Sequence, residues 1–458
     1  MIGDNLPSSL MNHLAMLTSN TTSYTAVQFL QRQAASLLLY QSVLQSDVGK
    51  SFLNLLQTIR YTDTDGRDCL QAYGNYFQVL TSGNQTWEEY LIKQILRADN
   101  AFSKLAQQQE FSKLPPALVA AVRHDLQVLQ SLYECNSAVL SEWVQMATHL
   151  PISPVVWYRE PETVGIETDI ITFISQLENW GHAVEDLAAY YGQHGSGLFA
   201  QYHAFRWQNG QLVGIVYADT VRLSTLVGYE WQKDALVKNT EFLLSGEKAL
   251  HVLLYGSRGS GKSSLVKALL NEYSHRKLRL IEVSKSELPD LPKIVEQLRG
   301  VPQKFIIFVD DLSFEEDDDA FKMMKVVLEG NVTARPENVV VYATSNRRHL
   351  IREFFTDRPA PKDNNEVHGW DTMEEKLSFS DRFGLTLTFE AADQKTYLQI
   401  VQHLAKNISI APEDLEYKAL QWATRHHGRS GRTARQFIDF LKADLAVFGE
   451  NKSLITEL

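Results

Sequence analysis

The feature that most constrains the fold is an alternation of short, largely apolar segments with helical patterns in the second half of the chain. Such segments are typical of strands buried on both faces of a sheet, and their alternation with helices predicts a parallel sheet. The fold class expected is therefore α/β. We expect strands at residues 251–255, 278–283, 305–309, 339–343 and 385–389.

At 458 residues, the chain is too long for one compact core, so we expect two or three domains. Apolar residues at helical spacing in the first part, interrupted by turn residues, predict a mostly helical N-terminal domain. Two strand-like segments then flank Asn209-Gly210, a dipeptide that favours a hairpin turn with positive φ. The domains expected are a helical domain at 1–195, a hairpin linker at 196–222, a core at 223–390 and a helical lid at 391–458.

Composition narrows the class of protein. Hydrophobic residues make up 44% of the chain and charged residues 22%, as in ordinary globular proteins. The net charge of −11 argues against wholesale wrapping of nucleic acid, although a local basic groove stays compatible with it. No apolar run approaches the roughly 20 residues that span a bilayer, and the first basic residue is Arg32, unlike a secretory signal. We expect a cytoplasmic protein with no membrane partner, in which Cys69 and Cys135 are buried thiols.

A glycine-rich motif lies directly after the expected strand at 251–255 and before a helical pattern at 264–273. Gly256-Ser257-Arg258-Gly259-Ser260-Gly261-Lys262-Ser263 satisfies the pattern GxxxxGK[ST]. Backbone N–H groups of such a loop turn toward phosphate oxygens, and the helix that follows adds a partial positive charge. Lys262 would reach the β- and γ-phosphates, and Ser263 would offer its hydroxyl to Mg²⁺. The motif predicts a nucleotide-phosphate site.

Acidic and amide side chains end two later strands. Asp310 and Asp311 follow the apolar segment 305–309, where Asp310 fits a Mg²⁺-holding role and Asp311 a water-polarising one. Asn346 follows the next strand and would hydrogen-bond the attacking water or the γ-phosphate. Asp and Asn also begin ordinary turns, so each is a weaker signal than the glycine-rich motif. The acidic run 315–319 is interpreted as a solvated loop.

The order of these motifs, followed by Ser-Asp-Arg-Phe-Gly at 380–384, resembles the core of AAA+ ATPases. Its Walker A, Walker B, sensor 1 and arginine-finger elements would be the glycine-rich motif, Asp310-Asp311, Asn346 and Arg382. Residues 227–240 resemble the helix and loop that lead into the first strand and flank adenine, and 431–435 resemble sensor 2 at the start of a lid helix. The resemblance covers about 223–458. It is strongest to a bacterial family of predicted AAA+ ATPases of uncharacterised role, and more distant to ATPases of the DnaA and DnaC kind.

The resemblance implies ATP and Mg²⁺ as ligands, hydrolysis of ATP, and a homo-oligomer (ring or partial ring) with nucleotide held between neighbouring subunits. ATP hydrolysis would drive remodelling or loading of a protein or nucleic-acid partner. The residues implied are catalytic Asp311, Asn346, Arg382 and Arg435; nucleotide-binding Gly256, Ser257, Arg258, Gly259, Ser260, Gly261, Lys262, Ser263, Ser264, Val227 and Gly228; and metal-binding Ser263 and Asp310.

Some assignments keep alternatives. Many AAA+ proteins carry Asp-Glu where this chain has Asp310-Asp311, so turnover could be slow. Replication initiators also carry Asp-Asp, which stays compatible with hydrolysis. The alternative function is a nucleotide-gated binding switch that recruits a partner through residues 1–195. Arg432 is the alternative to Arg435 as the sensor 2 residue, and the arginines between 425 and 435 would also suit a nucleic-acid patch. Residues 352–376 are expected to form a long loop that could engage a substrate.

Overall fold

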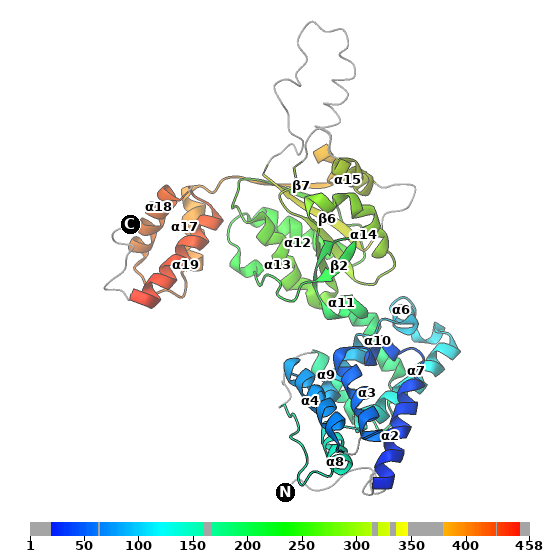
Figure 1. The fold of residues 1–458 in the computed structure, drawn as a ribbon. Helices are drawn as coiled ribbons and strands as arrows, with labels where there is room; N and C mark the ends of the chain where they lie inside the picture. Colours follow the sequence, from blue (N-terminus) through cyan, green and yellow to red (C-terminus); the bar gives the residue numbers. More distant parts are fainter. Residues whose placement is uncertain are drawn as a thin grey trace. The chain divides into compact units, whose positions relative to one another are not determined.

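The computed structural model describes residues 20–62, 65–159, 166–313, 319–329, 336–346, 379–426 and 428–448. The chain divides into two compact units, Met1–Gln201 and Tyr202–Leu458 (Figure 1). The loop expected at 352–376 and the acidic residues 315–318 lie outside the described residues.

The first unit is helical, which confirms the sequence prediction. Polar caps set several helix starts: the Ser46 side chain accepts from Gly49 N, and Thr86 and Glu89 form a capping box. The helices are α2 (Asn20–Ala35), α3 (Asp47–Arg60), α4 (Arg67–Ser82), α5 (Trp87–Leu96), α6 (Ala101–Ala106), α7 (Pro116–Glu134), α8 (Ser137–Thr148), α9 (Ile166–Gln176), α10 (Val184–His194) and α11 (Gly197–Gln201).

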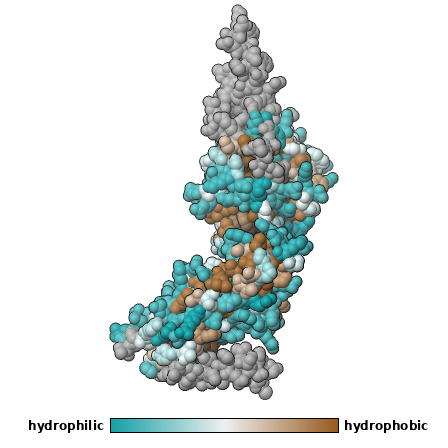
Figure 2. All heavy atoms as spheres, turned by 90° about the vertical axis from the view of Figure 1, so that its right-hand side faces the viewer, coloured by the Kyte–Doolittle hydropathy of each residue, from teal (hydrophilic) through white to brown (hydrophobic). Residues whose placement is uncertain are grey.

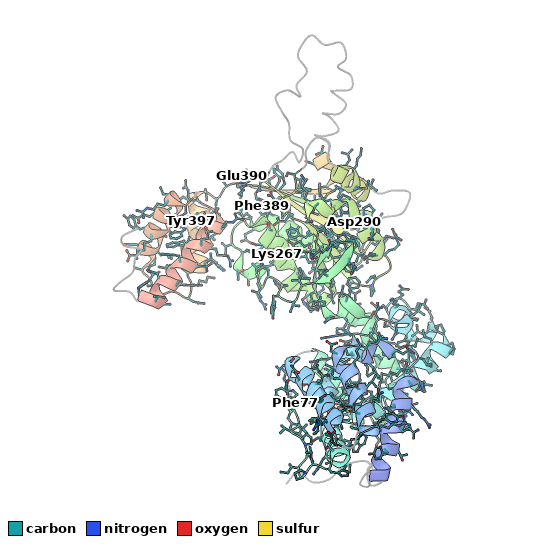
Figure 3. All side chains as sticks on the ribbon, viewed as in Figure 1. Phe77, Lys267, Asp290, Phe389, Glu390 and Tyr397 are labelled. Carbon is teal, nitrogen blue, oxygen red and sulfur yellow. The ribbon has the colours of Figure 1, made fainter. Side chains whose placement is uncertain are left out.

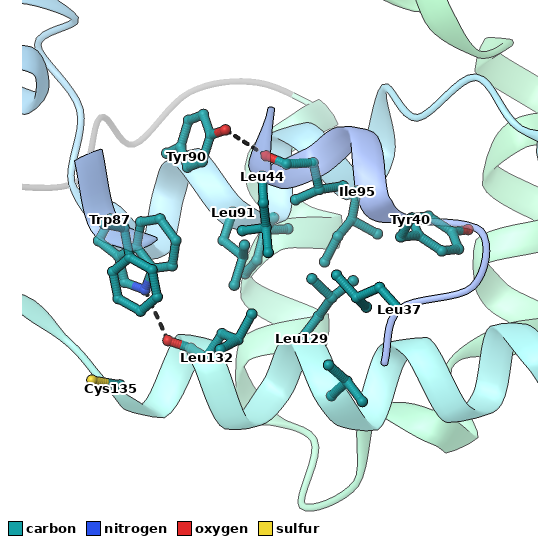
Figure 4. Packing of buried hydrophobic residues seen from close by; sticks show 14 of the residues in the cluster. Leu37, Tyr40, Leu44, Trp87, Tyr90, Leu91, Ile95, Leu129, Leu132 and Cys135 are labelled. Carbon is teal, nitrogen blue, oxygen red and sulfur yellow. Dashed lines mark hydrogen bonds between the residues drawn. The ribbon is translucent and has the colours of Figure 1, made fainter. Parts of the chain in front are cut away.

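Large aromatic side chains fill the core of this unit. The Trp87 ring stacks on Phe52 with ring centroids 3.9 Å apart, and its Nε1 donates to the carbonyl of Leu132 at 2.9 Å (Figure 4). The polar atom of this fully buried tryptophan is thereby satisfied. Cys69 and Cys135 are buried free thiols, as expected.

A fully buried carboxylate ties the segment after α2 to α7. Asp125 accepts hydrogen bonds from the backbone N–H groups of Leu38, Leu39 and Tyr40, at distances of 2.7–3.1 Å. A buried carboxylate is tolerated when N–H donors surround it in this way. Asp125 therefore fixes the path of the chain between α2 and the rest of the unit.

The second unit is built on a seven-stranded sheet of order β2-β1-β4-β5-β6-β3-β7. The strands from β3 to β7 are all parallel to their neighbours, as predicted. Lys304–Val309 and Val339–Ser345 are almost wholly buried because helices cover both faces. The strands are β1 (Ala204–Gln208), β2 (Gln211–Gly214), β3 (Val252–Gly256), β4 (Leu278–Glu282), β5 (Lys304–Val309), β6 (Val339–Ser345) and β7 (Leu385–Phe389).

The hairpin forms where it was expected, but it is not a linker. Asn209 and Gly210 have φ of 51° and 79°, as a tight hairpin requires. However, β1 also pairs in parallel with β4, with Ala204 opposite Leu280, so the hairpin is the edge of the main sheet. The reason is the apolar inner side of β1, whose Phe205 and Trp207 are fully buried. Assigning 196–222 to a linker was therefore wrong.

Helices flank the sheet and form the lid. The core contains α12 (Glu230–Leu244), α13 (Lys262–Tyr273), α14 (Leu291–Gln297) and α15 (Asp319–Glu329). The lid consists of α17 (Gln394–Leu404), α18 (Pro412–Arg425) and α19 (Gly431–Phe448), which share a small core around Tyr397 and Phe437. The predicted α/β fold with a parallel sheet and a helical lid is therefore confirmed.

The surface is consistent with these buried cores. Hydrophilic residues cover much of the described surface on the face shown in Figure 2, with hydrophobic residues gathered in smaller areas. Among the described residues, none of the helices combines the length and apolar character needed to cross a membrane.

Candidate functional site

The site lies at the carboxyl ends of β3, β5 and β6, which are neighbours in the sheet. The glycine-rich loop follows β3, the paired aspartates follow β5, and Asn346 follows β6. These segments and the lid line a cavity of about 570 Å³. Of the predicted residues, those lining it are Val227, Gly228, Arg258, Gly259, Ser260, Gly261, Lys262, Ser263, Ser264, Asp310, Asp311, Asn346 and Arg435.

Two glycines of the loop have a positive φ and close neighbours where a side chain would lie. A Cβ at Gly256, whose φ is 136°, would lie 1.9 Å from the carbonyl oxygen of Phe389. A Cβ at Gly259, whose φ is 74°, would lie 2.9 Å from Ser430 Oγ in the lid. Gly256 and Ser257 do not line the cavity themselves; Ser257 N donates instead to Phe389 O. These two residues hold the loop against β7.

Lys262 is the buried cation of the site, with a residue exposure of 6%. Its Nζ donates to the carbonyl oxygens of Gly256 at 3.0 Å and Ser257 at 2.8 Å. Burial lowers the pKa of Lys262, while the charges of Asp310 and Asp311 act in the opposite direction. The ammonium group is therefore oriented by the same loop whose N–H groups would hold phosphate.

Two polar pairs connect the loop with β5 and β6. The Ser263 hydroxyl donates to Asp310 Oδ1 at 2.6 Å, and the Asn346 amide donates to Asp311 Oδ1 at 2.6 Å. Asp311 has a φ of 52°, a left-handed conformation that is uncommon outside glycine. The turn after β5 thus directs the first carboxylate to the loop and the second to the end of β6.

Sequence reasoning missed several residues that line the cavity. Thr344 donates to Asp310 Oδ1 at 2.5 Å and accepts from Asp311 N at 2.9 Å. The register of β5 and β6, in which Val309 pairs with Ala343, places the next residues of the two strands side by side. Tyr229, Lys233 and Gly431 lie within the segments expected to flank adenine and to form sensor 2, and the other residues missed are Thr225, Leu226, Leu265, Phe389, Ile400 and Leu404.

The far part of the cavity is more apolar and joins the core to the lid. Val227 packs on the lid cluster, and the lid contributes Ile400 and Leu404. The Tyr229 ring lies 5.1 Å from that of Phe389, centroid to centroid, at the end of β7. Aliphatic and aromatic walls of this kind suit a planar base.

The arginines divide into two groups. Arg432 and Arg435, both on α19, line the cavity, and the backbone N–H of Arg432 donates to Gly259 O at 3.1 Å. Arg382 ends the short helix η8 (Phe379–Arg382) and is not among the residues lining the cavity of its own chain. The structure therefore does not bring Arg382 together with the other predicted residues.

The donor set fits Mg²⁺ and a nucleotide. The serine hydroxyl and aspartate carboxylate that meet at 2.6 Å are hard oxygen ligands of the kind that Mg²⁺ takes. The glycine cradle, the N-terminus of α13 and Lys262 offer donors and positive charge for phosphates. The residues present thus match a metal-bound nucleoside triphosphate in charge and in chemistry.

Sheet order, phosphate loop, polar strand ends and helical lid together define a nucleotide-binding protein of the AAA+ class. Residues 200–445 match the family described as "Protein of unknown function (DUF815)", and the chain belongs to this family. No curated protein matches the chain.

Solved structures of RuvB from Thermotoga maritima share a distant likeness with the chain. The structure titled as the Holliday junction branch migration motor is 17% identical, with a TM-score of 0.37, over 52% of this chain and 69% of that one. A lysine-to-arginine mutant of the same protein gives 16% identity and a TM-score of 0.37, over 52% and 70%. The class assignment rests on the sheet order and site of this chain itself.

Proposed function

We propose that this protein binds ATP with Mg²⁺ and hydrolyses it. The observation that supports this is the convergence, on one cavity of about 570 Å³, of a phosphate loop, a hydroxyl–carboxylate pair and an amide–carboxylate pair. A site for binding alone needs the loop and the metal ligands. The second pair, at the end of β6, has the groups that orient a water molecule for attack on a phosphate.

Each residue has a separate task in this proposal. The loop from Gly256 to Ser264 and the segment Val227-Gly228 bind the nucleotide, and Lys262 neutralises phosphate charge. Ser263 and Asp310 hold Mg²⁺, which when bound offsets the negative charge of the transferred group. Asp311 accepts the proton of the attacking water, and Asn346 holds that carboxylate and the water in place.

We further propose that the chain works as an assembly, in which Arg382 reaches the nucleotide of a neighbouring copy. Its position outside the cavity of its own chain supports a contribution across an interface. Arg435 takes the sensor 2 role, with Arg432 as the alternative; alanine at each position, compared for ATP affinity, separates the two. The assembly would remodel or load a protein or nucleic-acid partner, which the helical unit would recruit.

One observation favours a second function, a nucleotide-gated switch with little turnover. Asp311 is shorter than glutamate by one methylene, and its Oδ1 already accepts a hydrogen bond of 2.6 Å from Asn346. A shorter carboxylate whose oxygen already accepts this hydrogen bond would polarise water weakly. The switch would bind Mg-ATP and a partner without releasing phosphate.

Steady-state phosphate release by the purified full-length chain distinguishes the two functions. For an ATPase we expect turnover that requires Mg²⁺ and is lost in Lys262→Ala. Tight binding of Mg-ATP with phosphate release no greater than in Lys262→Ala would establish the switch. Absence of ATP binding to the wild type would contradict both.

A further inference from the structure

A single hydroxyl group connects the two aspartates of the site. Thr344 Oγ1 accepts a hydrogen bond of 2.9 Å from the backbone N–H of Asp311 and donates one of 2.5 Å to Asp310 Oδ1. The same Asp310 oxygen accepts from Ser263 Oγ at 2.6 Å. These bonds form one chain from the turn after β5, through β6, to the first turn of α13.

The backbone of Thr344 holds the same turn. Its carbonyl accepts from Leu312 N at 2.7 Å, so Thr344 contacts the backbone on the far side of Asp311 as well. Asp311 has a φ of 52°, and a non-glycine residue in this conformation persists only where its surroundings hold it. Thr344 is 2% exposed, so packed neighbours surround the side chain that makes these contacts.

We infer that Thr344 is the positioning residue that sets both carboxylates for the metal and for the attacking water. Its hydroxyl fixes Asp310 through the side chain and Asp311 through the backbone. One hydroxyl group therefore positions both the carboxylate assigned to the metal and the carboxylate assigned to water. Valine, which has the same shape, can do neither. The inference rests on the proposed function of the site, because it assigns Asp310 to Mg²⁺ and Asp311 to water.

The first test measures metal binding without hydrolysis. Affinity for the non-hydrolysed analogue AMP-PNP is measured by calorimetry with Mg²⁺ and with EDTA, for wild type, Thr344→Val and Thr344→Ser. Residues that orient metal ligands contribute about 10–100-fold to metal affinity. We therefore expect Thr344→Val to lose about 10–100-fold of the gain in affinity that Mg²⁺ gives, with its affinity in EDTA unchanged. Thr344→Ser, which keeps the hydroxyl, should restore most of the gain.

A matched control separates positioning from stability. Thr388→Val removes a hydroxyl from β7 of the same sheet, where Thr388 donates to the Tyr255 hydroxyl at 2.8 Å and does not line the cavity. It should keep the full effect of Mg²⁺. In turnover, Thr344→Val should lower kcat by about 10–100-fold with little change in KM, because a misplacement of about 1 Å is enough for such a loss.

The possible results distinguish the positioning role of Thr344 from the proposed hydrolysis of ATP. A folded Thr344→Val with the wild-type Mg²⁺ effect, or a Thr344→Ser as impaired as valine, overturns the positioning role. If the wild type binds Mg-AMP-PNP but releases no phosphate from ATP, the hydrolytic function fails while the metal-binding test of Thr344 still stands. If Mg²⁺ does not affect nucleotide affinity in the wild type, both the metal assignment and the inference fail.

Discussion

The side-chain amide of Asn346 donates a hydrogen bond of 2.6 Å to the carboxylate of Asp311, so the residues that end β5 and β6 form one polar unit. Neither strand alone would fix this geometry. It depends on the parallel pairing of the two strands, in which Val309 lies opposite Ala343.

This pair predicts a separation of binding from turnover. Asp311→Asn removes the proton acceptor but keeps the shape of the side chain, so Mg-ATP should still bind while phosphate release falls at least about 100-fold. Asp439→Asn, at an exposed position of α19, is the matched control and should behave as wild type. Normal phosphate release by Asp311→Asn would move the catalytic task to another residue.

Lys262 should be required for ATP binding and dispensable for folding. Lys262→Ala removes a point charge that faces the loop, not a packing group of the core. Lys267→Ala, on the same helix and outside the cavity, is the control (Figure 3). We expect binding to be lost only in the first variant, with circular dichroism unchanged in both. Unaltered ATP affinity of a folded Lys262→Ala would contradict the phosphate-loop assignment.

Arg382 should act on nucleotide held by a neighbouring copy. An arginine presented to the γ-phosphate contributes about 10³–10⁵ in rate in related enzymes, whereas a surface ion pair contributes about 0–1 kcal/mol to stability. Mixing Arg382→Ala with Lys262→Ala, each nearly inactive alone, should restore part of the activity, because some interfaces then join an intact loop to an intact arginine. A mixture shown to co-assemble but still inactive would exclude a contribution in trans.

The helical unit provides a prediction on stability. Asp125→Ala leaves the N–H groups of Leu38, Leu39 and Tyr40 buried without their acceptor. Hydrogen bonds to charged groups contribute about 1.5–3 kcal/mol each, so the variant, which loses three of them, should lose at least about 4 kcal/mol of unfolding free energy. Asp99→Ala, at an exposed residue of the same unit, should lose less than about 1 kcal/mol. Urea denaturation measures both, and equal losses would show that the buried bonds do not stabilise the unit.

The sequence was most informative where the signal is local. Residues 385–389 form a strand with the predicted bounds, and the turn at Asn209-Gly210 has the predicted conformation, because periodicity and turn chemistry depend on neighbouring residues. Pairing of distant segments was not predictable in this way. The union of β1 with β4 was missed, since no local signal specifies which strand a hairpin joins.

The same reason explains what was found and missed in the site. Lys262 and Asp310 stand out because a motif or a strand end marks them. Thr344 also follows the strand expected at 339–343, but no role was predicted for it, because only the register with β5 places its hydroxyl beside the two aspartates. Lid residues such as Ile400 reach the cavity through tertiary packing alone, which apolar helical spacing does not reveal.

The close approach of Gly256 to β7 restricts which residues can replace this glycine by mutation. A Cβ there would lie 1.9 Å from Phe389 O, and Phe389 precedes the residues that lead into the lid (Figure 3). Every substitution would push the phosphate loop and the strand before the lid apart together. In a library randomised at this codon, we expect the ATP-binding clones to encode glycine alone. At Gly74 in α4, where an added Cβ meets nothing within 4 Å, many residues should survive the same selection. Whether Gly256 or Gly74 can be replaced thus depends on the atoms that an added Cβ would meet, and at Gly256 those atoms are the backbone of β7.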